Sequence, residues 1–269
     1  MVLRPNDRRN LRRQARILRL VHARPSLTSL SRLVPLPLLT GVESEWAFLV
    51  ESRLPGRRPA PVVAGTGRTL RDALSTIALL HGGTACPATV DETLLRRWVA
   101  ARVGIVSALL GGDDSDVASA EALVRLESEL RGRLAGCSVR IGWIHGDYWP
   151  GNVLVAEDGS ILGVVDWDSL QSRELPLHDS LHYVVTERRL EAGEPWGRAV
   201  GRMLSASSTE AEESALAEMR LTAPGIDRRT ALLLYWLRGV EANWRRHPAV
   251  TAQPAWLRAN VRPVLEALV

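Results

Sequence analysis

The chain has 269 residues, of which 46% are hydrophobic and 24% charged, a balance typical of a soluble globular protein that can bury a large core. No apolar stretch approaches the ~20 residues of a membrane-spanning helix, and no signal-peptide core follows the arginine-rich start, so we expect a cytoplasmic protein without a membrane partner. The net charge is +4, all 34 basic residues are arginine, and two cysteines without metal-like spacing argue against a disulfide framework or a cysteine zinc site.

The first predicted element is an amphipathic helix over residues 7–22. Its apolar residues repeat at helical spacing and are Leu11, Ala15, Ile17, Leu18 and Val21. Eight arginines within residues 1–24 face a single acid, so a basic arm for nucleic acid or membrane is an alternative. The periodicity favours arginines on the solvated face of the helix, and no interleaved aromatic residues are present for base stacking. We therefore expect no nucleic-acid partner.

Two strand-like runs, residues 33–40 and 45–51, follow this helix. A segment rich in proline, glycine and arginine, residues 54–67, then has the composition of a linker. It predicts a boundary between a small N-terminal lobe, residues 1–56, and a larger C-terminal lobe, residues 57–269.

The larger lobe is predicted to be mainly helical around a few strands. The predicted helices are residues 70–81, 90–110, 116–134 and most of the chain from about residue 195, with an apolar run at 139–144 between them. Ser207 and Thr209 precede Glu210 and Glu212 by three residues, which is the spacing of a capping box. Helices that flank a small set of strands indicate an α+β class weighted to α.

Structural roles are sufficient to explain the two cysteines and two of the histidines. We expect Cys86 and Cys137 to be buried free thiols. His178 and His182 stand four residues apart, which suggests a zinc hydrolase, but the glutamate of the His-Glu-x-x-His pattern and a third ligand are missing. Core or surface histidines explain this pair better.

The segment from residue 144 to 168 carries the chemistry. Two runs rich in valine and isoleucine, residues 152–156 and 161–165, flank an Asp158-Gly159 turn and predict a β-hairpin. A turn centred there places Asn152 opposite Val165, so Asn152 and Asp166 share the open end of the hairpin about 5 Å apart.

Asp147 reaches the same end of the hairpin through the short loop 147–152. Two oxygen ligands at the spacing of Asn152 and Asp166 can hold one hard divalent cation. Three oxygen-bearing groups that converge need a counter-charge, and a bound magnesium ion would supply it.

These motifs resemble those of the aminoglycoside phosphotransferase/choline kinase group, which has the protein-kinase-like fold. The resemblance rests on His145-Gly146-Asp147, Asn152 and the run Val164-Val165-Asp166-Trp167-Asp168. Flanking matches are Leu54-Pro55-Gly56, Leu80-His81 and the Pro176 to Asp179 segment. It implies a two-lobed fold with an incomplete small lobe and a mainly helical large lobe.

The resemblance also implies roles for single residues. Asp147 would be the catalytic aspartate that orients the acceptor hydroxyl, and Asn152 and Asp166 would bind Mg²⁺. The backbone of Glu51, Ser52 and Arg53 would form the hinge that meets the adenine of ATP. Asp179 would brace the catalytic loop, His145 would be structural, and Asp168 would contact a second metal or cap a turn.

The sequence departs from the family pattern near its start. Family members carry a glycine-rich loop, a phosphate-binding lysine and a glutamate that holds the lysine. Here no lysine exists, Gln14 stands about where the glutamate is expected, and Gly65-Thr66-Gly67 lies out of order in the linker. Either the coding sequence begins upstream or ordinary ATP binding has been lost. The intact catalytic motif favours the first explanation.

Two functions are therefore expected. The first is transfer of the ATP γ-phosphate to a hydroxyl of a small molecule of the aminoglycoside, sugar or amino-alcohol type. The alternative is a non-catalytic kinase-like binding or regulatory module without a complete ATP site. An acidic cluster, Glu210, Glu212, Glu213 and Glu218, would be either a rim for a polycation or a solvated helix face. The large aromatic residues Trp196, Tyr235, Trp236 and Trp244 are expected in the core rather than around a substrate.

Overall fold

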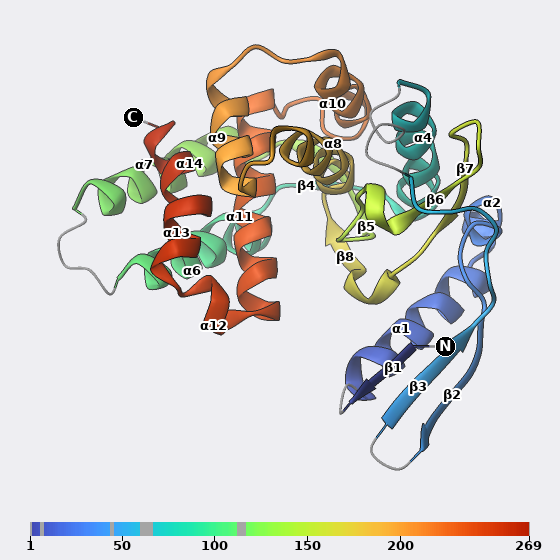
Figure 1. Cartoon of the computed structure of the whole chain (residues 1–269). Helices are drawn as coiled ribbons and strands as arrows, with labels where there is room; N and C mark the ends of the chain where they lie inside the picture. The colour runs from blue at the N-terminus through green and yellow to red at the C-terminus, as the bar shows by residue number, and fades with distance from the viewer. Residues whose placement is uncertain (1, 6–7, 44–45, 60–66, 112–116, 269) are drawn as a thin grey trace. The chain divides into compact units, whose positions relative to one another are not determined.

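The computed structural model describes residues 2–5, 8–43, 46–59, 67–111 and 117–268 (Figure 1). The fold is α+β, with three small sheets among many helices, as the sequence predicted. The chain divides into two compact units, Met1–Cys86 with Ile141–Tyr183, and Pro87–Arg140 with Val184–Val269. The predicted lobes, residues 1–56 and 57–269, are a different division of the chain and stay a prediction.

The first unit begins with a three-stranded antiparallel sheet. Its strands are β1 (Val2–Pro5), β2 (Pro37–Glu43) and β3 (Trp46–Glu51), in the order β1-β3-β2. The sequence did not predict β1, a four-residue strand whose only strand partner is β3. A short 3-10 turn (Pro25–Leu27) and α2 (Thr28–Ser31) come before the predicted run at 33–40. The run begins later than expected because the Leu33 and Val34 amides donate to Leu30 O and Ser31 O in the turn that ends α2.

Helix α1 (Arg8–Ala23) packs on β2 and β3 and matches the predicted helix. All five of its periodic apolar residues are buried. Arg9, Arg12, Arg13, Arg16 and Arg19 are exposed. The prediction that these arginines form a solvated helix face is confirmed.

The chain after β3 is tied to a later hairpin. Arg57 and Val155 exchange two backbone hydrogen bonds, of 3.1 and 2.8 Å. Helix α4 (Gly67–Thr84) then extends the predicted helix at both ends. Gly65 and Thr66, which belong to the Gly65-Thr66-Gly67 segment of the linker, lie outside the described residues.

The predicted hairpin is present as β6 (Val153–Val155) and β7 (Ile161–Val164). Val153 pairs with Val164 and Leu154 with Gly163, which is the predicted register, and the register shifts by one at Val155. A further sheet has the order β4 (Cys86–Thr89), β5 (Ser138–Ile144) and β8 (Gln171–Glu174). Of these, only β5 was predicted as an apolar run.

The second unit is built mainly of helices (Figure 1). The predicted helix 90–110 is formed by α5 (Glu92–Leu95), a π-helical segment (Arg96–Ala100) and α6 (Ala101–Leu110). Other helices are α7 (Val117–Leu134), α9 (Trp196–Ser205), α10 (Glu210–Thr222), α11 (Arg228–Arg246), α12 (Pro248–Thr251), α13 (Pro254–Asn260) and α14 (Arg262–Glu266). Helix α8 (Leu177–Ala192) contains the boundary between the units.

The capping box predicted at the start of α10 is confirmed. The Thr209 amide donates to Glu212 Oε2 at 3.2 Å, and the Glu212 amide donates to Thr209 Oγ1 at 3.4 Å. Glu212 is also fully buried, where it forms ion pairs with Arg188 and Arg228. This glutamate stabilises the second unit from inside rather than facing solvent.

Two expectations about burial were wrong. Cys86 is exposed and Cys137 is only half-buried, although both are free thiols as expected. Cys86 begins the short strand β4, where neither face is covered along its whole length. Tyr235 and Trp236 are core residues as expected, whereas Trp196 is only half-buried and Trp244 near the end of α11 is 36% exposed. In the described part of the chain, no helix has the length and apolar character needed to cross a membrane.

Candidate active site

The loop before the hairpin is held by Asp179, in the first turn of α8. The amides of His145 and Gly146 donate to its two carboxylate oxygens at 2.7 and 2.9 Å, and His81 Nε2 donates to it at 3.2 Å. Gly146 has φ +85°, a backbone conformation that favours glycine. Asp179 therefore braces this loop, as expected.

Asp179 remains ionised although its side chain is only 1% exposed. Burial alone would raise its pKa, but the hydrogen bond and charge of His81 and the Gly146 amide outweigh burial, and the pKa is lowered. Its place in the first turn of a helix also favours a negative charge.

His145 connects the loop to the hairpin from a fully buried position. Its Nδ1 accepts from the Asp147 amide at 3.3 Å, so Nε2 carries the proton and donates to the Val165 carbonyl at 3.1 Å. Burial is the main cause of its lowered pKa, which keeps the ring neutral. Its ring also packs edge-on against Trp167, with centroids 4.6 Å apart. The expected structural role of His145 is confirmed.

The side chain of Asp147 is partly exposed, at 24%. Asn152 Nδ2 donates to the Asp147 carbonyl at 2.9 Å and lies 3.5 Å from its Oδ2. His182 Nε2 donates to Oδ1 at 3.3 Å. His182 and Asn152 thus both contact the Asp147 carboxylate.

His182 was not among the site residues predicted from the sequence. Its position could have been predicted, because His182 follows Asp179 by three residues on α8, and residues three apart share a helix face.

A zinc role for His178 and His182 finds no support. Within the described ranges, no group of three His, Cys, Asp or Glu side chains is placed to hold a metal ion.

Asp166 stands two residues after the end of β7 in a left-handed backbone conformation, with φ 65° and ψ 58°. Such a conformation costs a non-glycine residue about 1–3 kcal/mol and persists only where the surroundings fix it. Here the Val165 amide donates to Asn152 O at 2.9 Å and the Val164 amide donates to Leu33 O at 2.7 Å. The hairpin register thus holds Asn152 beside the residue that precedes Asp166.

Electrostatics places Asp147, Asp166 and Glu51 in one neighbourhood. The charges of Asp147 and Asp166 both act on His145, and the charge of Asp166 also acts on Glu51. Burial is the main cause of the raised pKa of Glu51, and Asp166 raises it further. The structure therefore brings the candidate catalytic and metal-binding residues together, with the end of β3 close by.

The three expected hinge residues follow one another at the end of β3. Gln14 Nε2 donates to Glu51 Oε1 at 2.8 Å, so the glutamine stands next to the hinge from α1. The Ser52 amide donates to Leu36 O at 2.9 Å, and the Leu36 amide donates to Ser52 Oγ at 2.8 Å. Arg53 is exposed. The hinge backbone is thereby fixed to the segment that precedes β2.

The donor set fits a hard cation. Asp166 offers a carboxylate, and Asn152 offers its side-chain Oδ1 because its Nδ2 is turned toward Asp147. Oxygen ligands of this kind suit Mg²⁺, which keeps several waters or takes phosphate oxygens for the rest of its octahedron.

Comparisons with known proteins agree with this geometry. A family model described as the phosphotransferase enzyme family matches residues 1–204. Comparison with curated proteins gave no match. A thermostable mutant of aminoglycoside phosphotransferase APH(4)-Ia in its apo form is similar in structure, with TM-score 0.60, 15% identity, and coverage of 98% of this chain and 86% of that one.

Two other solved structures are also similar. The GDP complex of wild-type aminoglycoside 2'-phosphotransferase-IIIa has TM-score 0.54 and 14% identity, and covers 96% of this chain and 82% of that one. Macrolide 2'-phosphotransferase type I has TM-score 0.55 and 16% identity, with 95% and 79% covered. The family model spans the loop, the hairpin and α8, so this chain belongs to the phosphotransferase enzyme family and has the kinase-like fold of the aminoglycoside phosphotransferases.

Proposed function

We propose that this phosphotransferase transfers the γ-phosphate of ATP to a hydroxyl group of a small molecule. The observation that carries the proposal is the placement of Asp147. Its carboxylate is partly exposed, is restrained by His182 and Asn152, and stands at the same hairpin end as Asp166. Phosphoryl transfer depends mainly on such positioning and on charge neutralisation.

Asp147 would act as the base. Its carboxylate, which accepts from His182 through Oδ1, would accept the proton of the acceptor hydroxyl. His182 would orient the carboxylate through the Oδ1 hydrogen bond. A base held in this way needs little reorganisation when the hydroxyl arrives.

Asn152 and Asp166 would hold Mg²⁺ through their side-chain oxygens. Bound there, the ion would neutralise negative charge on the phosphate oxygens of the nucleotide. The fixed hairpin register and the left-handed backbone at Asp166 position these two side chains.

The backbone of Glu51, Ser52 and Arg53 would meet the base of the nucleotide. Because the Ser52 amide already donates to Leu36 O, the contacts to the base would come from its two neighbours in the chain. The GDP in the structure of aminoglycoside 2'-phosphotransferase-IIIa supports nucleotide use by this fold. With no lysine in the sequence, the metal ion and arginines would neutralise the phosphates.

We propose that the acceptor is a hydroxylated small molecule that need not carry several positive charges. The names of two similar structures mention an aminoglycoside and a macrolide, which both carry hydroxyl groups. Glu212 is buried in ion pairs, and Glu213 pairs with Arg220, so neither supports an acidic rim. The side chain of Glu218 lies outside the described residues.

A non-catalytic kinase-like module remains the second candidate. The absence of any lysine from the sequence favours it, because the family uses a lysine on the phosphates. The restrained yet partly exposed Asp147 favours the enzyme, because a pure binding module has no need of a base.

Titration calorimetry of the full chain with ATP and Mg²⁺ tests the proposal. We expect saturable binding that is lost in Asp166→Ala. Asp158→Ala is the matched control, because Asp158 is an exposed acid at the opposite end of the same hairpin, where it pairs with Arg68. Binding by the control but not by Asp166→Ala supports the metal assignment.

The second step is an assay of ADP release with a panel of hydroxylated acceptors. Acceptor-dependent release supports the enzyme. Binding of nucleotide without release for any acceptor class supports the non-catalytic module instead. No nucleotide binding by the unaltered chain contradicts both the site and the transfer reaction.

A further inference from the structure

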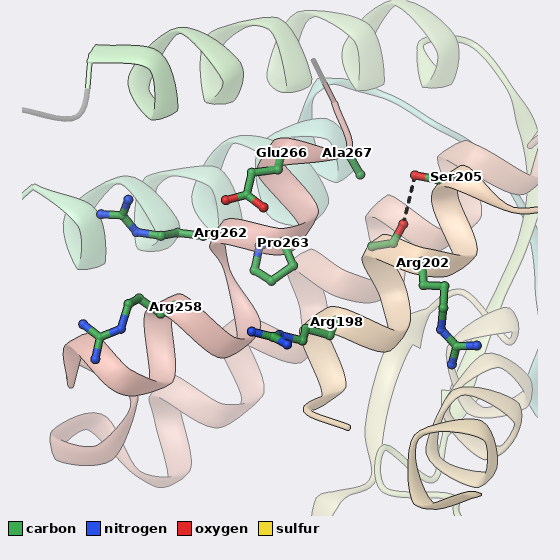
Figure 2. A pocket seen from close by; sticks show the side chains of 9 residues that line it. Arg198, Arg202, Ser205, Arg258, Arg262, Pro263, Glu266 and Ala267 are labelled. Carbon is green, nitrogen blue, oxygen red and sulfur yellow. Dashed lines mark hydrogen bonds between the residues drawn. The ribbon is translucent and has the colours of Figure 1, made fainter. Parts of the chain in front are cut away.

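A second polar site lies in the second unit, between α9 on one side and α13 and α14 on the other. It is a pocket of about 680 Å³ (Figure 2). Four of its nine lining residues are arginines, namely Arg198, Arg202, Arg258 and Arg262, and Glu266 is the one acid among the nine. All of its described residues belong to the second unit, whereas Asp147, Asn152 and Asp166 belong to the first.

Close helix packing forms this pocket. A β-carbon on Gly197 would lie 2.2 Å from Asn260 Cα, and one on Gly201 would lie 2.6 Å from the Pro263 carbonyl oxygen. The Gly197 amide also donates to Asn260 Oδ1 at 3.1 Å. Two glycines one turn apart thus let α9 approach α13 and α14 closely. Arg198 follows Gly197 directly, so the same packing brings it to the arginines of the other helices.

The arginines of the pocket differ in their partners. Arg202 forms an ion pair with Glu194. Figure 2 shows Arg198, Arg258 and Arg262 extending to the same side, while Arg202 extends to the other. Among the residues that the structure describes, no carboxylate forms an ion pair with Arg198 or Arg258. In the same unit, Arg188 and Arg228 both pair with Glu212.

The uncompensated charge indicates the sign of a ligand. Arg198 and Arg258 carry two positive charges, and no carboxylate of the described residues forms an ion pair with either of them. Like charges held together on packed helices repel one another, and a bound polyanion would remove that repulsion. Guanidinium groups recognise phosphate oxygens through paired hydrogen bonds.

We propose that this pocket binds a small molecule that carries two or more phosphoryl groups. The volume of the pocket falls in the usual range of small-molecule sites, about 300–1,000 Å³. A pocket of this volume is larger than a single phosphate ion requires. None of the nine described lining residues is aromatic, so the pocket offers no platform on which a nucleic-acid base would stack. A phosphorylated sugar or an inorganic polyphosphate fits these features.

Calorimetric titration of the full chain with inorganic pyrophosphate tests the proposal. Low ionic strength keeps electrostatic binding measurable. EDTA removes metal ions, and in their absence the acidic cluster around Asp147, which consists of Asp147, Asp166, Asp179 and Glu51, would repel pyrophosphate. We expect saturable binding by the unaltered chain. The double variant Arg198→Gln with Arg258→Gln should bind at least about tenfold more weakly.

The matched control is the double variant Arg96→Gln with Arg125→Gln. Both of these arginines are exposed, lie in the second unit and are not part of the pocket, so the control loses the same net charge. We expect its affinity to stay within about twofold of the unaltered chain. Because all four substituted arginines are exposed, both double variants should unfold at nearly the temperature of the unaltered chain.

Three outcomes would overturn the proposal. The first is no saturable binding of pyrophosphate, and the second is an equal loss of affinity in both double variants, which would indicate long-range charge alone. The third is equal affinity for pyrophosphate and inorganic phosphate, which would contradict the need for two phosphoryl groups. Asp166→Ala should retain pyrophosphate binding in EDTA, so this test stands independently of the proposed transfer reaction.

Discussion

The acidic cluster around Asp147 and the arginine pocket beside α9 concentrate charge of opposite sign by different means. In the acidic cluster, donors within the chain compensate the buried charge of Asp179, which accepts two backbone amides and His81. In the arginine pocket, helix packing at Gly197 and Gly201 brings like charges together, and Arg198 and Arg258 have no described carboxylate partner. Asp179 is thus compensated within the chain, whereas Asp166 is proposed to need Mg²⁺ and the arginine pocket an anion.

The largest expected effect comes from removing the base of the acidic cluster. Asp147→Asn should lower the rate of phosphate transfer by about 10²–10⁴-fold, because an amide cannot accept the proton of the hydroxyl. The substitution keeps the size of the side chain, so the unfolding temperature should change little. The measurement is acceptor-dependent ADP release at saturating nucleotide. Activity near that of the unaltered chain would remove Asp147 from its proposed role.

Asp179→Ala should cause the largest loss of stability. It leaves two loop amides and His81 without their acceptor inside the protein, which should reduce the free energy of unfolding by about 3–5 kcal/mol. Urea denaturation at about pH 7 measures this loss. A loss below about 1 kcal/mol would show that water satisfies these donors and that the loop is not braced.

The same residue gives a pH dependence with a defined sign. The folded-state pKa of Asp179 lies below its ordinary value of 3.8, so its contribution is full above that value and is lost as the pH falls through the folded-state pKa. Asp179→Asn should therefore differ most from the unaltered chain near neutral pH, and the two should converge in strong acid.

Gly201→Ala tests whether close packing forms the arginine pocket. The added β-carbon would lie 2.6 Å from the Pro263 carbonyl oxygen, so α9 and α14 must separate, at a cost of about 1–3 kcal/mol in the free energy of unfolding. Gly132→Ala in α7 is the control, because no atom lies within 4 Å of its β-carbon position. The control should stabilise by about 0.5–1 kcal/mol. Equal effects at both positions would mean that the packing tolerates separation.

Glu187 lies on the same helix as Asp179 and allows a buried acid without donors to be compared with one that has them. Its buried Oε1 has no hydrogen-bond partner among the described residues, and burial is the main cause of a pKa raised to about 7. The folded-state pKa exceeds the ordinary value of 4.5, so Glu187 lowers the free energy of unfolding progressively as the pH rises above that value. Glu187→Gln should stabilise the chain by about 1–2 kcal/mol above about pH 8 and have little effect near pH 4.

Urea midpoints of the two proteins across this pH range measure the effect of Glu187. A constant difference between them would show that Glu187 has the same pKa in the folded and unfolded states, and that its carboxylate finds water in the folded state.

The hairpin and its polar end were readable from the sequence because their determinants are local. A turn at Asp158-Gly159 and two valine-rich runs fix the register, and the register alone places Asn152 near Asp166. The buried face of α1 was readable for the same reason, since its period is a property of one helix. The roles of Asp147, Asn152 and Asp166 in transfer stay predictions.

What the sequence did not reveal depends on contacts between distant segments. Strand β1 has few strand-forming residues and is held by pairing with β3, more than forty positions later. His182 reaches Asp147 only because Asp179 anchors α8 to the loop. The arginine pocket joins residues near 200 with residues near 260 through two glycines, and no local pattern marks such an approach.

The two backbone hydrogen bonds between Arg57 and Val155 have a consequence for motion. They tie the segment after the proposed hinge to β6, the strand that pairs with β7 and so with the strand that leads to Asp166, and neither segment can then open locally without the other. Amide exchange at the Arg57 and Val155 positions should therefore follow one opening equilibrium. A nucleotide that orders the hinge would slow exchange in the hairpin as well, and the base-binding and metal-binding ends of the site would respond to their ligands as a single cooperative unit.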